Sequence, residues 1–148
     1  LRHALGERAS FDQDLADRLP PILADRSVMT GLVERLICRA AEGIGSQWGT
    51  ITLSTGVVGV GNGPLFSGDL AAELPHGHYV YLEVHDTGPS TNAVARLQIS
   101  EPFLSAAFPR HAITHATALL LMHHHGGELR MESAPWSGTS VVMLFPFA

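Results

Sequence analysis

The feature that most constrains the fold is a strand-like stretch that runs into a sharp turn, YVYLEVHDTGPS at residues 79–90. Val80, Leu82 and Val84 alternate with other residues, which is typical of a β-strand with one buried face. Aspartate, glycine and proline follow in DTGPS, and these residue types end a strand and turn the chain. The pattern fits an ordinary turn. It also fits a site in which the Asp86 carboxylate, at a strand end, binds a polar planar ligand.

An amphipathic helix is predicted upstream, over residues 25–45. Asp25 or Ser27 can cap its N-terminus, because their side-chain oxygens accept a hydrogen bond from a free backbone N–H. Gly43 and Gly45 are expected to end it. Its apolar residues recur at helical spacing and form one stripe, which includes Val28, Leu32, Leu36, Ala40 and Ile44.

The rest of the chain mixes strand-like and helix-like segments. Residues 48–60 are rich in β-branched side chains and predict a strand, or a hairpin bent at Gly56. The mixture predicts an α+β fold, a two-layer α/β sandwich with a mixed, mostly antiparallel sheet and helices on one face. The other predicted elements are an edge strand over 8–15, a helix over 112–123, and two strands over 128–132 and 140–145.

Length and composition predict a single cytoplasmic domain over residues 1–148. The 148 residues suit one domain, and a hydrophobic content of 45% suffices for a packed core. The net charge of -5 disfavours nucleic acid as a partner. The one cysteine, Cys38, excludes an internal disulfide and fits a reducing compartment. No apolar run approaches the roughly 20 residues that span a bilayer, so we expect no membrane contact.

In their order, these segments resemble the ATP-binding catalytic domain of sensor histidine kinases, within the GHKL ATPase superfamily. Asp86 and Gly88 match the family's Asp-x-Gly-x-Gly motif, in which the aspartate accepts a hydrogen bond from the adenine amino group. Ser90 replaces the second glycine. Thr139, which follows Gly138, matches the Gly-Thr of the last hairpin, beside the adenine site. The resemblance implies that the adenine side of a nucleotide site is retained.

The metal and phosphate positions of the family carry different residues here. Arg39 stands where the family has a Mg²⁺-holding asparagine on the first long helix, and Arg35 lies one turn earlier. Arginine is a permanent cation without an acceptor, so it cannot bind Mg²⁺. The family's Glu-Pro-Phe is present at residues 101–103, but RHAITH at 110–115 replaces its glycine-rich phosphate box. The resemblance therefore implies that the metal and phosphate side is degenerate.

Two hypotheses describe the arginines. Arg35 and Arg39 share one face of the predicted helix, so they could clamp the phosphates of a nucleotide in place of the metal. Alternatively, they pair with acids such as Glu34 or Glu42, or fill the former pocket.

The histidine triplet at residues 123–125 resembles a metal site in composition. Neighbouring residues on one helix point in different directions, so these side chains chelate poorly. A position near a helix C-terminus also favours cationic side chains without any metal. We therefore predict no metal site.

As a functional prediction, the resemblance implies a degenerate histidine-kinase-type domain of two-component signalling. Phosphoryl transfer depends on positioning and on charge neutralisation, usually by Mg²⁺. We therefore expect a pseudokinase whose ATP binding is lost or weakened, so that any ATP or ADP binds weakly and without Mg²⁺, and which performs no phosphoryl transfer. It would act as a regulatory or docking module. Its expected partners are a response regulator, or the kinase and phosphotransfer domains of the same pathway.

One alternative is a pure protein-binding domain, in which apolar side chains such as Ile113 and Leu119 fill the former ATP cavity. Two further alternatives stay open at this point, and with them the question of enzymatic activity. One is an active sensor kinase domain that binds ATP with atypical motifs. The other is the C-terminal domain of a histidine phosphotransferase, although the helical hairpin that carries the phospho-accepting histidine is not found in residues 1–148.

Overall fold

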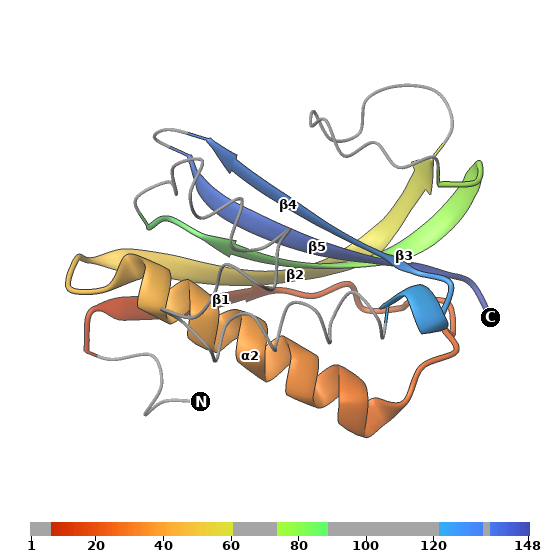
Figure 1. Ribbon diagram of the computed structural model, residues 1–148, viewed down its shortest axis with the longest axis horizontal. Helices are drawn as coiled ribbons and strands as arrows, with labels where there is room; N and C mark the ends of the chain where they lie inside the picture. Colours follow the sequence, from red (N-terminus) through yellow and green to blue (C-terminus); the bar gives the residue numbers. More distant parts are fainter. Residues whose placement is uncertain (1–6, 61–73, 89–121, 135–136) are drawn as a thin grey trace, which may run out of the picture.

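The computed structural model describes residues 7–60, 74–88, 122–134 and 137–148. In these ranges the chain forms a five-stranded sheet with helix α2 (Arg26–Ile44) packed across one face (Figure 1). The strand order is β1-β2-β3-β5-β4; β1 runs parallel to β2, and the other neighbours are antiparallel. The predicted α+β sandwich with a mostly antiparallel sheet is confirmed. The strands are β1 (Ala9–Asp14), β2 (Gly49–Val60), β3 (Gly77–Asp86), β4 (Glu128–Ala134) and β5 (Gly138–Pro146).

Helix α2 begins and ends at polar or flexible residues, as its sequence indicates. Asp25 is the N-cap, and its side chain accepts a hydrogen bond of 3.0 Å from the Val28 amide. Gly45 is the C-cap, with a φ of 62° that favours glycine. Gly43 was also expected to end the helix, but it lies inside α2. No helix within the described ranges combines the length and the apolar character needed to cross a bilayer.

The alternative of a hairpin at Gly56 is wrong, because β2 continues unbroken from Gly49 to Val60. Gly56 faces Tyr81 across the β2–β3 pair. A Cβ at position 56 would lie 2.6 Å from Cε1 of the Tyr81 ring, so the ring covers the glycine. A glycine within a strand marks a close contact here rather than a turn.

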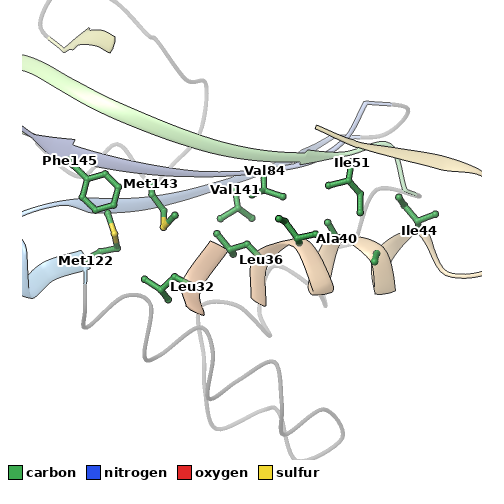
Figure 2. Close-up of a cluster of buried hydrophobic side chains, with 12 residues drawn as sticks. Leu32, Leu36, Ala40, Ile44, Ile51, Val84, Met122, Val141, Met143 and Phe145 are labelled. Atoms are coloured by element: carbon green, nitrogen blue, oxygen red, sulfur yellow. The ribbon is translucent and has the colours of Figure 1, made fainter. Parts of the chain in front are cut away.

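The main core lies between α2 and the sheet. The buried stripe of α2 contacts apolar side chains of β2, β3 and β5, as Figure 2 shows. Each such side chain stabilises the fold by about 1.5–3 kcal/mol when fully buried. This packing fixes the C-terminal half of α2 over the end of β3. The largest fully buried side chains in this core are Leu36, Ile37, Ile51, Met122, Val141 and Met143.

Alternation along β3 decides which face Asp86 occupies. Leu82 and Val84 belong to the core on the α2 side, and Asp86 follows with the same parity. Tyr79 belongs to a smaller cluster on the opposite face, together with Val142 and Leu144 of β5. The carboxylate that ends β3 therefore lies on the side covered by the helix.

The remaining predicted elements fall partly or wholly outside the described residues. Ser90, the Glu-Pro-Phe at 101–103 and the RHAITH segment at 110–115 lie there, as does most of the predicted helix over 112–123. Residues 122–124 form a helical turn, in which His123 and His124 are exposed. The predicted edge strand over 8–15 is β1, at one edge of the sheet.

Candidate functional site at the end of β3

Asp86 is a buried carboxylate at the point where β3 ends, with 4% of its surface exposed. Its Oδ1 accepts a hydrogen bond of 3.0 Å from the Gly88 amide. A hydrogen bond from the amide two residues later to an aspartate side chain forms a local turn. The chain therefore leaves the sheet after Asp86. Thr87 ties the turn to β2, because its Oγ1 accepts from the Thr50 amide and its amide donates to the Thr50 carbonyl.

Two glycines allow backbone segments to meet around this carboxylate. A Cβ at Gly88 would lie 2.9 Å from both Oδ1 of Asp86 and the Gly43 carbonyl oxygen on α2. Gly138 has a φ of 77°, and a Cβ there would lie 1.8 Å from the Asp86 carbonyl oxygen. Any larger residue at position 138 would displace the end of β3.

Thr139 lies directly opposite Asp86 in the β3–β5 pair and is 2% exposed. Opposed residues in an antiparallel pair project to the same face with Cβ atoms about 4.5–5.5 Å apart. The structure thus brings together the residues of the predicted adenine side, namely Asp86, Gly88 and Thr139. They come from two strands and one turn.

Arg39 approaches the same carboxylate from α2. It lies one turn before Gly43 on the helix. A Cβ placed at Gly43 would lie 3.9 Å from Oδ1 of Asp86, so Gly43 and Arg39 both lie on the helix face toward the end of β3. Arg39 is half-buried, whereas Arg35 is exposed. Burial lowers the pKa of the Arg39 guanidinium, and the negative charge of Asp86 opposes that effect. The structure separates the two arginines that the sequence placed together.

The charge of Asp86 is set by opposing effects. Burial raises the pKa of the carboxyl above its ordinary value. The hydrogen bond from Gly88 and the positive fields of Arg39 and His85 oppose this rise without cancelling it. His85 itself points to the other face of the sheet, where its Nδ1 lies 2.9 Å from the Ser140 hydroxyl.

One oxygen of Asp86 accepts no hydrogen bond from the residues that the structure describes. Among the described residues, Gly88 is the single donor to this carboxylate, and it contacts Oδ1. Buried carboxylate oxygens ordinarily accept at least one hydrogen bond each, because an unsatisfied buried acceptor costs roughly 1–3 kcal/mol. The Oδ2 atom is therefore a buried acceptor available to a donor from outside the described chain.

Comparison with family models and with curated proteins finds no match. Among solved structures, the catalytic domain of histidine kinase ThkA, in a nucleotide-free form, matches with a TM-score of 0.67. The match covers 98% of this chain and 80% of that chain, at 17% identity. The chain has the fold of a histidine kinase catalytic domain. The resemblance drawn from the sequence is confirmed at this level.

Two further structures with the histidine kinase catalytic fold support the assignment. The mycobacterial sensor histidine kinase MprB matches with a TM-score of 0.62 and 19% identity, over 94% of this chain and 82% of that chain. Full-length ShkA in complex with AMPPNP matches with a TM-score of 0.66 and 22% identity, over 99% of this chain and 27% of that chain. One fold can host several functions, so what this histidine-kinase-like domain does must be argued from its own residues.

Within the described part of this histidine-kinase-like domain, Arg39 brings a guanidinium group, which has no acceptor atom for a metal ion. No group of three or more His, Cys, Asp or Glu side chains lies close enough to hold a metal there. The cation of Arg39 lies on the helix face beside Asp86, where it opposes a second positive charge. Mg²⁺ requires several oxygen ligands in near-octahedral geometry.

Sequence reasoning missed Gly43 as part of this site and interpreted it as a helix stop. Its role depends on Gly88, which packs against its carbonyl group. One signal was available, since a glycine inside a helix costs about 1 kcal/mol relative to alanine and so indicates a special contact.

Proposed function

We propose that this domain is a histidine-kinase-type module of two-component signalling that retains the base-binding side of a nucleotide site and performs no phosphoryl transfer. The observation that carries the proposal is the buried Oδ2 of Asp86, which accepts no hydrogen bond from the described residues. The exocyclic amino group of adenine is a donor of the right kind for this acceptor. Thr139, buried directly opposite, places a second polar residue beside it.

The absence of phosphoryl transfer follows from the charge beside this site. Transfer of a phosphoryl group needs the negative charge on the phosphates to be neutralised and the groups to be held in line, usually with Mg²⁺. Arg39 brings a cation but no acceptor for a metal. It supports binding of an anion better than binding of a metal complex. In this proposal Arg39, rather than the exposed Arg35, is the arginine that would contact a phosphate group.

In this proposal the ligands are adenosine nucleotides, ATP or ADP included, bound weakly and without a need for Mg²⁺. The module would act in the cytoplasm by regulation or docking. Its partners would be a response regulator or the kinase and phosphotransfer domains of the same pathway. A nucleotide that binds the folded state raises the melting temperature by mass action, and this makes the proposal measurable.

The test is a thermal-shift titration with AMP, ADP and ATP, each with and without Mg²⁺. We expect all three nucleotides to raise the melting temperature, with no enhancement by Mg²⁺. Asp86→Ala should abolish the shift. Asp12→Ala is the matched control, because Asp12 is an exposed aspartate on β1; it should leave the shift unchanged.

Two results would overturn the proposal. One is a nucleotide shift that persists in Asp86→Ala, because the base would then bind elsewhere. The other is Mg²⁺-dependent transfer of radiolabelled γ-phosphate from ATP to a histidine-containing phosphotransfer domain, which would identify an active kinase domain instead.

A further inference from the structure

A cavity of about 150 Å³ lies toward the N-terminal half of α2, away from Asp86. The helix contributes Met29 and Val33 to its wall. The sheet contributes side chains of β2, β3 and β5, among them Leu82 and Met143. The connection between β1 and α2 covers part of it with Leu19 and Ile22. Three separate parts of the chain therefore line one partly open space.

The wall of this cavity is largely apolar. Its lining residues are aliphatic or aromatic apart from the hydroxyl-bearing Thr55 and Tyr81, and the Tyr81 ring lies over Gly56. The Thr55 hydroxyl accepts a hydrogen bond of 3.1 Å from the Ala16 amide, in the connection that borders the cavity. Water needs two to four polar partners in a buried site, so this space does not suit it.

The volume and the chemistry together define the guest. An apolar cavity of about 150 Å³ lined by aliphatic and aromatic side chains stays dry and accepts benzene or xenon. A guest of this kind restores the dispersion contacts that the lining atoms lack across an empty space. Charged or hydrogen-bonding molecules would lose their hydration without compensation.

The connection between β1 and α2 provides a way in. It has no regular secondary structure over residues 15–25, and Leu19 is 38% exposed although it lines the cavity. Apart from the capping bonds of Asp25 to α2, its described hydrogen bonds to the rest of the fold are few: Ala16 donates to Thr55, and the Pro21 carbonyl accepts from the Ala148 amide at 2.8 Å. A guest needs to displace the Leu19 side chain rather than to open the sheet.

We propose that the cavity between α2, the sheet and residues 19–22 is a binding site for one small, neutral, apolar molecule of about the size of benzene. This site is independent of the nucleotide site. It shares α2 and β3 with Asp86, but none of its lining residues contributes to the Asp86 turn.

The first test is a titration of the protein with benzene, and separately with xenon, followed by NMR of ¹³C-labelled methionine and isoleucine methyl groups. Met29, Met143 and Ile22 line the cavity, so their methyl signals should shift and saturate. Ile44 and Ile51 are buried in the same core but do not line it, so their signals should stay in place. Absence of saturation, or equal shifts at all five residues, would overturn the proposal.

The second test fills the space. Val33→Phe places a ring where the guest would lie and should weaken benzene binding at least tenfold. Val57→Phe is the matched control, since Val57 is 46% exposed and does not line the cavity; it should bind benzene as the natural chain does. Undiminished binding by a folded Val33→Phe variant would overturn the proposal. If that variant fails to fold, the methyl titration of the natural chain decides.

Discussion

Near its C-terminus, α2 adds a close backbone contact at Gly43 to its side-chain packing, whereas near its N-terminus it packs through long side chains around a cavity. At the first end, Gly88 fits against the carbonyl group of Gly43 with no room for a methyl group. At the second end, a cavity of about 150 Å³ lies between Met29 and Val33 on the helix and the facing strands. The same helix and the same sheet therefore produce one close contact and one loose contact.

The difference follows from the residues at each end. Glycines let two backbones approach, and the close approach keeps water from the Asp86 carboxylate, which is 4% exposed. At the other end Met29, Val33 and Leu19 are bulky but do not interdigitate fully, so a space remains. The close glycine contact holds the Asp86 carboxylate in one position. The cavity near Met29 and Val33 leaves room for an apolar guest.

The largest expected effect is at the close end. Gly138→Ala adds a methyl group that would lie 1.8 Å from the Asp86 carbonyl oxygen, at a φ of 77° that favours glycine. We expect the free energy of unfolding to fall by about 3 kcal/mol or more. Urea denaturation measures it. Gly31→Ala is the control, because no atom lies within 4 Å of a Cβ at that position in α2. It should gain up to about 1 kcal/mol. Equal stabilities of the two variants would contradict the close packing around Asp86.

The second prediction concerns Asp86 itself. Burial raises its folded-state pKa above the ordinary 3.8, so its contribution to stability is present below that value and is lost as pH rises through the raised pKa. Asp86→Asn removes this titration. The variant should therefore gain stability relative to the natural chain as pH increases from 4 to 8, by about 1.4 kcal/mol for each unit by which the pKa is raised. Urea denaturation at several pH values measures it. A difference in stability that is constant with pH would contradict the burial of an ionisable group here.

A smaller effect is expected at Arg39. Arg39→Met removes the positive charge of the guanidinium near Asp86, and the pKa of the Asp86 carboxyl should rise further. The loss of stability at pH 7 should be of order 1 kcal/mol, and it should shrink at low pH, where Asp86 is protonated. Arg35→Met changes an exposed arginine on the same helix and should stay within about 0.5 kcal/mol. Identical losses for the two variants would show that Asp86 does not sense Arg39.

The smallest effect, with the opposite sign, is expected at the loose end. Val33→Leu adds one methylene group next to the cavity. Partial filling should stabilise the fold by up to about 1 kcal/mol, as cavity-filling substitutions commonly do. The thermal unfolding midpoint should rise slightly. A clear destabilisation would mean that this end of α2 is as closely packed as the other, and the contrast between the two ends would fail.

The sequence by itself determined most of the described elements. Helix α2 and the strand that ends at Asp86 follow from local periodicity, capping and turn chemistry, which depend on near neighbours in the chain. The Gly138-Thr139 pair was singled out by the resemblance to the histidine kinase family. The alternative of a hairpin at Gly56 was wrong, because a contact with Tyr81 on the next strand decides the role of that glycine.

Only the tertiary structure decided that Gly43 touches Gly88, that Arg39 rather than Arg35 approaches Asp86, and that a cavity lies beside Val33. These facts depend on strand register and on the volumes of side chains far apart in sequence. No local sequence pattern predicts strand register or the fit of distant side chains, because the packing of each element depends on all the elements that it contacts.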